Sequence, residues 1–377
     1  MKRHLFTPGP TPVPPQVLAA LAEPVVHHRS PDFRPIFRSC LDRLTEVFRS
    51  SSEPLMFTAS GTGAMESAVA NTAQPGDRIV VVSAGNFGER WAQIARAFDC
   101  EVEVVEYAWG EVPSADDLAA RLRELGGAKA VLLTHSETST GVVADVRSLA
   151  AAAREAGALS VVDAISSLGA VPLETDEWGI DVVVSGSQKA LMTPPGLAFA
   201  SVSHAAAGGK ARSYYFDWAR NRKAQDRLDA AYTPAVSLVV ALDVALGLLL
   251  EDGLEAGFDR HVRLGRACRE GIKAMGLELF SPDDDSSAVV TAVRMPEGLD
   301  AGEVVLSLRD RFGITLAGGQ GPVKGQIFRI GHIGWFDIFD ITAALAGVEL
   351  VLGELGADIE RGVAVSRALE TYEHSAV

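Results

Sequence analysis

The stretch DVVVSGSQKALMTPPG (181–196) places a lysine directly after a short apolar run. The run at 182–184 is rich in β-branched residues and ends in Ser and Gly, which is typical of a buried strand. Lys189 precedes three apolar residues. In such surroundings the pKa of a lysine falls and its amine can act as a nucleophile. The alternative is a surface lysine whose alkyl stem lies along apolar groups.

Outward from this stretch, strand and helix patterns alternate along the first 250 residues. Several apolar runs are continuous, which favours strands covered on both faces in a mainly parallel sheet. Helical patterns rich in Ala, Leu and Arg separate most of them. We expect strands at 54–60, 78–83, 101–107, 130–135, 159–164 and 181–186, and helices at 33–48, from 63, at 90–98, 115–125, 146–156 and 234–250.

The rest of the chain predicts a smaller α/β unit. Its pattern gives helices at 255–275, 301–312 and 338–355, with a strand at 327–333. The first fifteen residues hold five prolines and cannot form a helix interior. We therefore expect an N-terminal arm at 1–20, a large domain at 21–255 and a small domain at 256–377. The polar segment 361–377 is expected to fray.

The composition excludes several classes of protein. A chain of 377 residues with 47% apolar residues can bury a core and is not disordered. A net charge of −15 argues against a broad nucleic-acid surface or binding to anionic membranes, although a local pocket can still hold a small anion. No signal peptide, membrane helix or metal-ligand spacing stands out. Three separated cysteines indicate free thiols in a cytoplasmic protein.

Polar groups follow five of the expected strands. In open α/β sheets ligands bind beyond the carboxyl ends of the strands, so these groups are expected at one rim. Ser60-Gly61-Thr62-Gly63 opens a helix, whose free amides and positive end can bind an anion. Asp163 ends an apolar strand, where a carboxylate is costly unless it meets a cation or hydrogen-bond donors. The alternatives are ordinary helix caps at these positions.

An anion site, a strand-end carboxylate and a lysine one strand later fit one cofactor. Pyridoxal 5'-phosphate (PLP) needs a lysine for its Schiff base, a carboxylate that keeps its ring nitrogen protonated, and a phosphate site. The sequence therefore predicts a PLP enzyme.

The sequence also resembles the class V aminotransferases of PLP fold type I, and among them the alanine–glyoxylate and serine–pyruvate (serine–glyoxylate) aminotransferases. The resemblance implies an α/β fold with a large domain, built on a mainly parallel central sheet flanked by helices, and a smaller C-terminal α/β domain. Matching segments span nearly the whole chain: PGPTPVPP (8–15), ASGTGAMES (59–67), SAGNFGERW (83–91), THSETSTGV (134–142), VVDAISSLG (161–169), SGSQKALMTPPG (185–196), YTPAVSL (232–238) and GGQGPVKGQIFRIGHIG (318–334).

The resemblance implies roles for individual residues. Lys189 would form the Schiff base and carry the substrate proton, and Asp163 would pair with the pyridine nitrogen. Arg329 would grip the substrate carboxylate with its planar guanidinium, unless it forms a structural ion pair, and Gly9 would lie over the same site. Further cofactor contacts are expected at Ser60, Gly61, Thr62, Phe87 (as the stacked ring), Thr138 and Gln188, and at Tyr232 and Thr233, which would reach the phosphate of a second subunit in a homodimer.

The implied activity is ping-pong transamination from L-alanine or L-serine to glyoxylate or pyruvate. Aspartate and ureidoglycine remain alternative donors, although no second arginine stands out for an aspartate side chain. Cysteine desulfurases are disfavoured, because the loop at 317–325 lacks a cysteine and Gln188 precedes the lysine where they have histidine. A nucleotide-binding oxidoreductase is supported only by Gly61-x-Gly63, with Glu66 in place of the third glycine.

Overall fold

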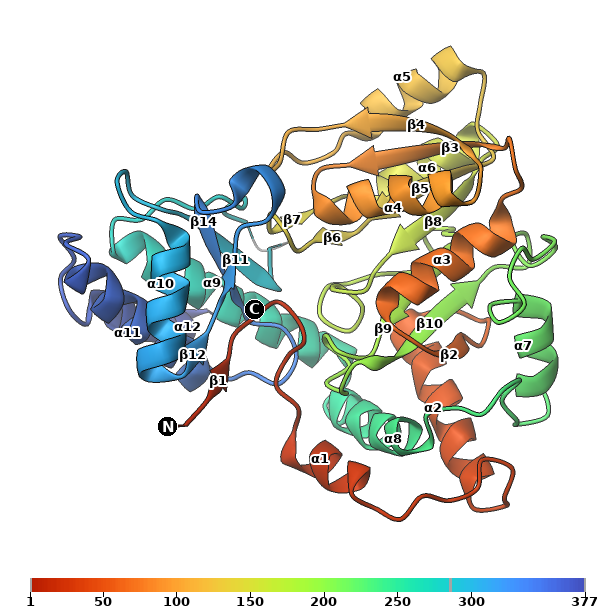
Figure 1. The fold of residues 1–377 in the computed structure, drawn as a ribbon, viewed down its shortest axis with the longest axis horizontal. Coiled ribbons are helices and arrows are strands. Elements are labelled where there is room, and N and C mark those ends of the chain that lie inside the picture. The colour runs from red at the N-terminus through yellow and green to blue at the C-terminus, as the bar shows by residue number, and fades with distance from the viewer. Residues whose placement is uncertain (1, 285–286, 376–377) are drawn as a thin grey trace.

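A seven-stranded sheet forms the centre of the larger part of the molecule (Figure 1). The computed structural model describes residues 2–284 and 287–375. The strand order is β2-β10-β9-β8-β5-β3-β4. All neighbours are parallel except β10, which is antiparallel to β2 and to β9, so the expected mainly parallel sheet is confirmed. The strands are β2 (Leu55–Ala59), β3 (Arg78–Ser83), β4 (Glu101–Glu106), β5 (Ala130–Thr134), β8 (Leu159–Asp163), β9 (Val182–Gly186) and β10 (Gly196–Val202).

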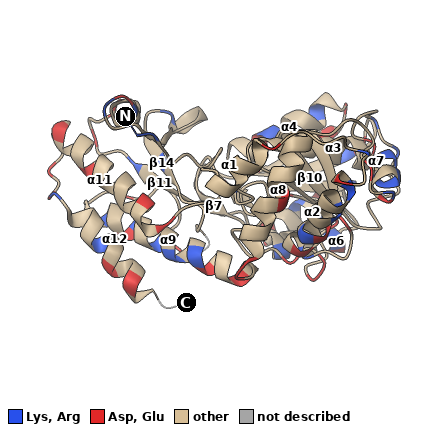
Figure 2. Ribbon diagram, turned by 90° about the horizontal axis from the view of Figure 1, so that it is seen from below, with Lys and Arg blue, Asp and Glu red and all other residues tan. Residues whose placement is uncertain are grey.

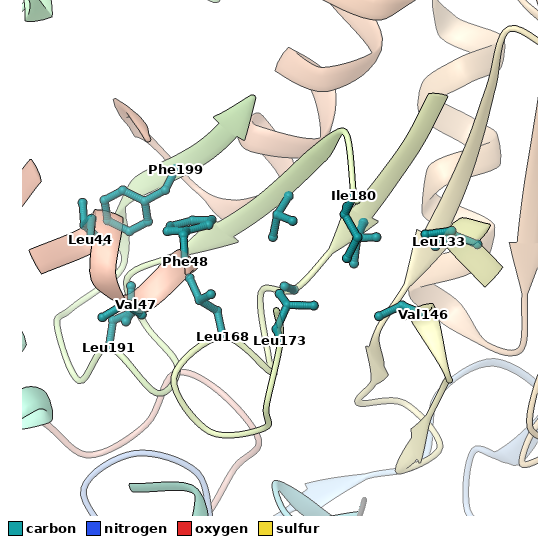
Figure 3. Close-up of a cluster of buried hydrophobic side chains, with 14 of the residues drawn as sticks. Leu44, Val47, Phe48, Leu133, Val146, Leu168, Leu173, Ile180, Leu191 and Phe199 are labelled. Atoms are coloured by element: carbon teal, nitrogen blue, oxygen red, sulfur yellow. The ribbon is translucent and has the colours of Figure 1, made fainter. Parts of the chain in front are cut away.

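Helices cover both faces of this sheet, because side chains along each strand alternate between two apolar clusters. Val80 and Val82 of β3 face one cluster, and Ile79 and Val81 face the other. Figure 3 shows part of the first cluster, where Phe48 lies near Phe199 of β10. Helices α2 (Phe33–Phe48), α5 (Ala115–Leu125), α6 (Val146–Glu155) and α8 (Val236–Leu250) cover the first cluster, and α3 (Gly61–Thr72), α4 (Asn86–Ala97) and α7 (Trp218–Gln225) cover the second.

Helix α8 is apolar on nearly all sides and is mostly tan in Figure 2. Its one charged side chain, Asp243, pairs with Arg43 of α2 at 2.7 Å. Helix α1 (Pro15–Leu21) packs on α8 through Val17 and Ala20. Among the described helices, none is both long enough and apolar enough to cross a membrane.

A second core forms around a three-stranded antiparallel sheet in the C-terminal part. Its strand order is β11-β14-β13, with bounds Val290–Arg294, Ile327–Gly331 and Ala317–Gly318. Strand β1 (His4–Leu5) pairs with β12 (Ile314–Thr315), and Phe6 is buried in this core. The expected boundary at 255/256 falls inside one helix, so the proposed division stays a prediction. The helices are α9 (Leu254–Ala274), α10 (Ala301–Ser307), α11 (Ile338–Glu354) and α12 (Val363–His374), with one π turn (Leu308–Phe312) and one 3-10 turn (Gly321–Val323).

The C-terminal segment forms helix α12 where the sequence predicted fraying. Ala364 and Ala368 are fully buried in the C-terminal core. The carboxylate of Glu349 in α11 accepts hydrogen bonds from the amides of Gly362 (2.9 Å) and Ala364 (2.6 Å). These bonds give an acceptor to amides at the start of α12 that have none within the helix. Residues 376–377 lie outside the described residues.

Replacing Phe6 by Ala tests whether the N-terminal arm belongs to the C-terminal core. The ring is 1% exposed and stacks on Phe336 at 5.7 Å. Its removal is expected to lower the free energy of unfolding by about 3 kcal/mol, measured by urea denaturation. Phe339→Ala, at a residue that is 72% exposed, is the control and is expected to change stability by less than about 0.5 kcal/mol. Equal effects of the two substitutions would contradict the docking of the arm.

Candidate active site

Lys189 lies in a tight turn between β9 and β10 that its neighbours hold in place. The hydroxyl of Ser187 donates to the carbonyl of Pro194 at 2.7 Å, and the Ser187 carbonyl accepts from the amide of Thr193 at 3.1 Å. The Lys189 side chain is buried, and its Nζ donates to the carbonyl of Pro8 at 2.7 Å. Burial lowers the pKa of this amine to about 8.

Asp163 ends β8, the strand next to β9 in the sheet. Its Oδ1 accepts a hydrogen bond from the amide of Ile165 at 2.8 Å. Burial raises the pKa of this carboxyl to about 7, against the opposing effects of that hydrogen bond and of the Lys189 charge. In the described part of the chain Asp163 forms no ion pair. The site therefore holds a carboxylate that lacks a cationic partner.

The start of α3 faces the same region. Ser60 precedes the helix in an extended conformation, and its side chain makes no capping hydrogen bond. A Cβ atom on Gly61 would come within 2.6 Å of Ile165 Cδ1, so glycine allows α3 to approach the end of β8. Arg90 of α4 donates to Thr62 Oγ1 at 3.2 Å. Free helix amides beside a cation form an anion-binding site.

These groups line one pocket of about 260 Å³. Four further residues line this pocket that were not predicted as site residues: Arg90, Ser136, Ile165 and Ser166. The guanidinium of Arg90 lies 4.7 Å from the centre of the Phe87 ring. The predicted site residues in the wall are Gly9, Ser60, Gly61, Thr62, Phe87, Asp163, Gln188 and Lys189.

Arg329 lies on β14 and is not among the residues that line the pocket. It is 5% exposed, and within the described residues its guanidinium donates only to backbone carbonyls: Nη2 to Gly318 at 2.7 Å and Nη1 to Thr138 at 2.6 Å. Burial lowers its pKa to about 10, so it remains a cation at neutral pH. No carboxylate in the described residues pairs with it, which argues against a structural ion pair and leaves the cation available to an anion.

Three other predicted residues do not line this pocket. Thr138 is buried and presents its backbone carbonyl to Arg329. Ser136, two residues earlier, does line the pocket, and its buried hydroxyl has no partner within the described residues. Tyr232 and Thr233 precede α8. There the Tyr232 hydroxyl donates to the carbonyl of Tyr214 at 2.7 Å.

Glu137 is one of the polar groups expected after the strand at 130–135, but sequence reasoning gave it no role. Its buried carboxylate accepts hydrogen bonds from the amides of Phe87 (2.9 Å) and Gly88 (3.2 Å) at the start of α4. The segments SAGNFGERW and THSETSTGV contain Glu137, Arg90 and Ser136. Arg90 is three residues after Phe87, a helical spacing that puts both on one face and that could have indicated their contact.

The comparisons with known proteins identify the family. A family model described as Aminotransferase class-V matches residues 3–330, and the chain belongs to this family. The soluble hydrogenase 42 kDa subunit of Anabaena cylindrica is 41% identical and aligns over 99% of each chain. A serine–glyoxylate aminotransferase of Methylorubrum extorquens is 36% identical, over 97% of this chain and 95% of the other.

The same comparisons establish the fold as PLP fold type I. The solved structure of ureidoglycine–glyoxylate aminotransferase from Bacillus subtilis aligns over 99% of both chains, with a TM-score of 0.94 and 33% identity. Membership of the class V aminotransferases leaves the nucleotide-binding oxidoreductase alternative without support.

The residues of the pocket suit PLP, the cofactor of this family. Gln188 Oε1 and Ser136 Oγ are buried without a partner among the described residues, so both side chains have unused hydrogen-bonding capacity. The buried carboxylate of Asp163 forms no ion pair among the described residues, the start of α3 can bind a phosphate, and the Lys189 amine lies in the same pocket. No group of three or more His, Cys, Asp or Glu side chains in the described regions could hold a metal ion.

Replacing Asp163 by Asn tests the cost of burying this carboxylate in the cofactor-free protein. Because folding raises the pKa from 3.8 to about 7, the folded state binds more protons than the unfolded state between these values, and stability falls as the pH rises through this window. The Asn variant should therefore gain about 2–3 kcal/mol relative to the wild type between pH 5 and pH 8. The measurement is urea unfolding at both pH values.

The exposed Asp116 provides the control for this experiment. Its replacement by Asn is expected to give the same difference from the wild type at both pH values. A constant difference for the Asp163 variant as well would show that burial does not perturb Asp163.

Proposed function

We propose that the protein is a PLP-dependent transaminase that moves the amino group of L-alanine or L-serine to glyoxylate or pyruvate by a ping-pong mechanism. The observation that carries this proposal is the arrangement of Lys189 and Asp163 in one buried pocket, with the unpaired cation of Arg329 close enough to lower the pKa of Lys189. The relatives named as glyoxylate aminotransferases support glyoxylate as the amino-group acceptor.

The binding roles follow from the chemistry of the pocket wall. PLP, when bound, supplies an electron sink for the bond that breaks at the substrate α-carbon. Asp163 would keep the ring nitrogen of PLP protonated, and the resulting cation would pair with the Asp163 carboxylate. Phe87 would stack on the ring. The phosphate would lie at Ser60, Gly61 and Thr62, with Gln188 beside them and Arg90 adding positive charge through its contact with Thr62.

Lys189 performs the proton transfer in this proposal. With a pKa of about 8, about a tenth of this amine is neutral at pH 7 and about half at pH 8, and the neutral amine can accept the α-proton of the substrate. Positioned general acid–base catalysis of this kind contributes about 10²–10⁴-fold. The carbonyl of Pro8, 2.7 Å from Nζ, provides an acceptor for the amine when it is free.

Arg329 would hold the substrate carboxylate, and Gly9 would leave room for the substrate. A Cβ atom at Gly9 would lie 2.3 Å from Lys189 Nζ, so a side chain there would occupy the space around the amine. Arg90 gives one reason to keep aspartate as a second candidate donor. It is a second arginine in the pocket wall and could pair with a side-chain carboxylate instead of serving the phosphate.

The visible absorption spectrum of the purified protein loaded with PLP tests the proposed function. A yellow band is expected, since the cofactor bound to Lys189 absorbs visible light. L-alanine or L-serine should bleach this band and glyoxylate should restore it. Bleaching by L-aspartate alone would select the second candidate.

Lys189→Ala is the control, because it removes the amine together with the rest of the side chain beyond Cβ. This variant is expected to show no lysine-bound band and no turnover with any donor. A wild-type protein that shows no band after incubation with PLP would exclude the proposed function.

The proposal includes a homodimer in which Tyr232 and Thr233 complete the site of the partner. Both residues lie outside the wall of their own pocket, and the ring of Tyr232 stacks on Tyr215 at 4.9 Å. The neighbouring Tyr214 is 70% exposed. Exposed aromatic side chains are enriched at protein interfaces.

Mixing two inactive variants tests this shared site. Lys189→Ala and Tyr232→Ala should each be nearly inactive. After random reassociation half the dimers are mixed, and each mixed dimer has one intact site, so about a quarter of the wild-type activity should return. A monomeric wild type in light scattering, or a mixture that stays inactive, would contradict the dimer.

We also propose a cytoplasmic location. The cysteines are Cys40, Cys100 and Cys268, and all three are free, as expected in a reducing compartment.

A further inference from the structure

We infer that Glu137 is a positioning residue whose carboxylate ties the start of α4, which carries Phe87, to the turn that receives Arg329. This inference deepens the proposed function and rests on it for the roles of Phe87 and Arg329. Glu137 would thus fix the position of Phe87, which faces the cofactor, relative to Arg329, which binds the substrate carboxylate.

The carboxylate of Glu137 is buried and fully used. It is 3% exposed, and its Oε2 accepts from the amides of Phe87 and Gly88. Its Oε1 accepts from the amide (3.1 Å) and the hydroxyl (2.5 Å) of Ser139. Helix α4 therefore receives its N-terminal cap from a residue about 50 positions away, because Gly85 before it has no side chain to supply one.

The backbone around α4 leaves room for this carboxylate. A Cβ atom on Gly85 would lie 2.6 Å from Glu137 Cγ and 2.6 Å from Ser139 Oγ. The hydroxyl of Ser139 also accepts a hydrogen bond from the amide of Asn86 at 3.1 Å. Three successive amides of α4 thus donate hydrogen bonds to the side chains of Glu137 and Ser139, and any side chain at position 85 would displace these two side chains.

The turn that carries Glu137 also holds Arg329. Strands β6 (Ser136–Glu137) and β7 (Val142–Val143) form a short hairpin, closed by a hydrogen bond from the amide of Gly141 to the carbonyl of Glu137 at 2.8 Å. Thr138, next to Glu137, presents its carbonyl to Arg329 at 2.6 Å. One rigid turn therefore fixes Phe87 by a side chain and Arg329 by a backbone oxygen.

The electrostatic effect of the Glu137 carboxylate supports the same positioning role. The charged groups on which the Glu137 carboxylate acts are Asp163, Lys189 and Arg329. The Glu137 carboxylate raises the pKa of Lys189 and of Arg329, against the larger effect of burial, and it also raises the pKa of Asp163. Its own pKa is raised by burial and lowered by its four hydrogen bonds. Removing the charge should therefore move the titration of the lysine toward lower pH.

The decisive variant is Glu137→Gln in the PLP-loaded enzyme, which keeps the shape of the side chain and removes its charge. Three changes are expected: an increase of about tenfold in the dissociation constant for PLP, an increase of about tenfold in KM for the amino donor, and a shift of about half a pH unit to lower pH in the midpoint of the visible band. Equilibrium dialysis, steady-state kinetics and a spectral pH titration measure them.

Two matched variants separate charge from shape and guard against misfolding of the Gln variant. Glu137→Asp keeps the charge but shortens the reach, so PLP affinity and KM should change while the midpoint stays. Ser139→Ala removes one donor and keeps the charge, so its midpoint should also stay. If both leave PLP affinity and KM unchanged, the positioning role is wrong.

Failure of this inference can be distinguished from failure of the proposed function. A wild-type enzyme that shows the band, together with a Gln variant of unchanged midpoint, KM and PLP affinity, would overturn the inference and leave the function intact. A wild type without the band would instead overturn the function.

Discussion

The structure depends on burying opposite charges at the ends of two adjacent strands. Asp163 at the end of β8 and Lys189 just beyond the end of β9 each lose hydration, and both pKa values move toward neutrality as a result. Helices exclude water from both faces of the sheet, so polar groups can gather only at its rim. The neighbouring charges act on these two groups in different directions. The Glu137 carboxylate raises the pKa of both Lys189 and Asp163, whereas the Arg329 cation lowers the pKa of Lys189.

Local patterns predicted the central residues because local chemistry fixes their surroundings. Asp163 ends an apolar run and Lys189 follows another, both rich in β-branched residues and typical of buried strands, and the glycine pattern at 61–63 marks a close helix approach. The alternation of runs likewise predicted six strands of the large sheet. β10 was missed because its apolar run follows Pro194, Pro195 and Gly196, and a short apolar segment has no period that separates strand from loop.

The residues that were missed act through contacts between distant parts of the chain. Glu137 was expected only as a polar group at the rim, and nothing near it in sequence indicates that it caps a helix that starts about 50 residues earlier. Ser136 lines the pocket where Thr138 was expected, since the β6–β7 turn points the Thr138 carbonyl at Arg329 instead. The roles of Tyr232 and Thr233 depend on a second subunit, which a single chain cannot supply.

The pairing of β1 with β12 has a consequence for the order of assembly. His4 lies opposite Ile314, so residues 310 positions apart must meet before the arm that carries Pro8 and Gly9 can settle beside Lys189. A chain that leaves the ribosome from its N-terminus can form the large sheet long before Ile314 has been made. The nascent protein therefore cannot complete its pocket until Ile314 has been made, and the reactive lysine is enclosed only after that point.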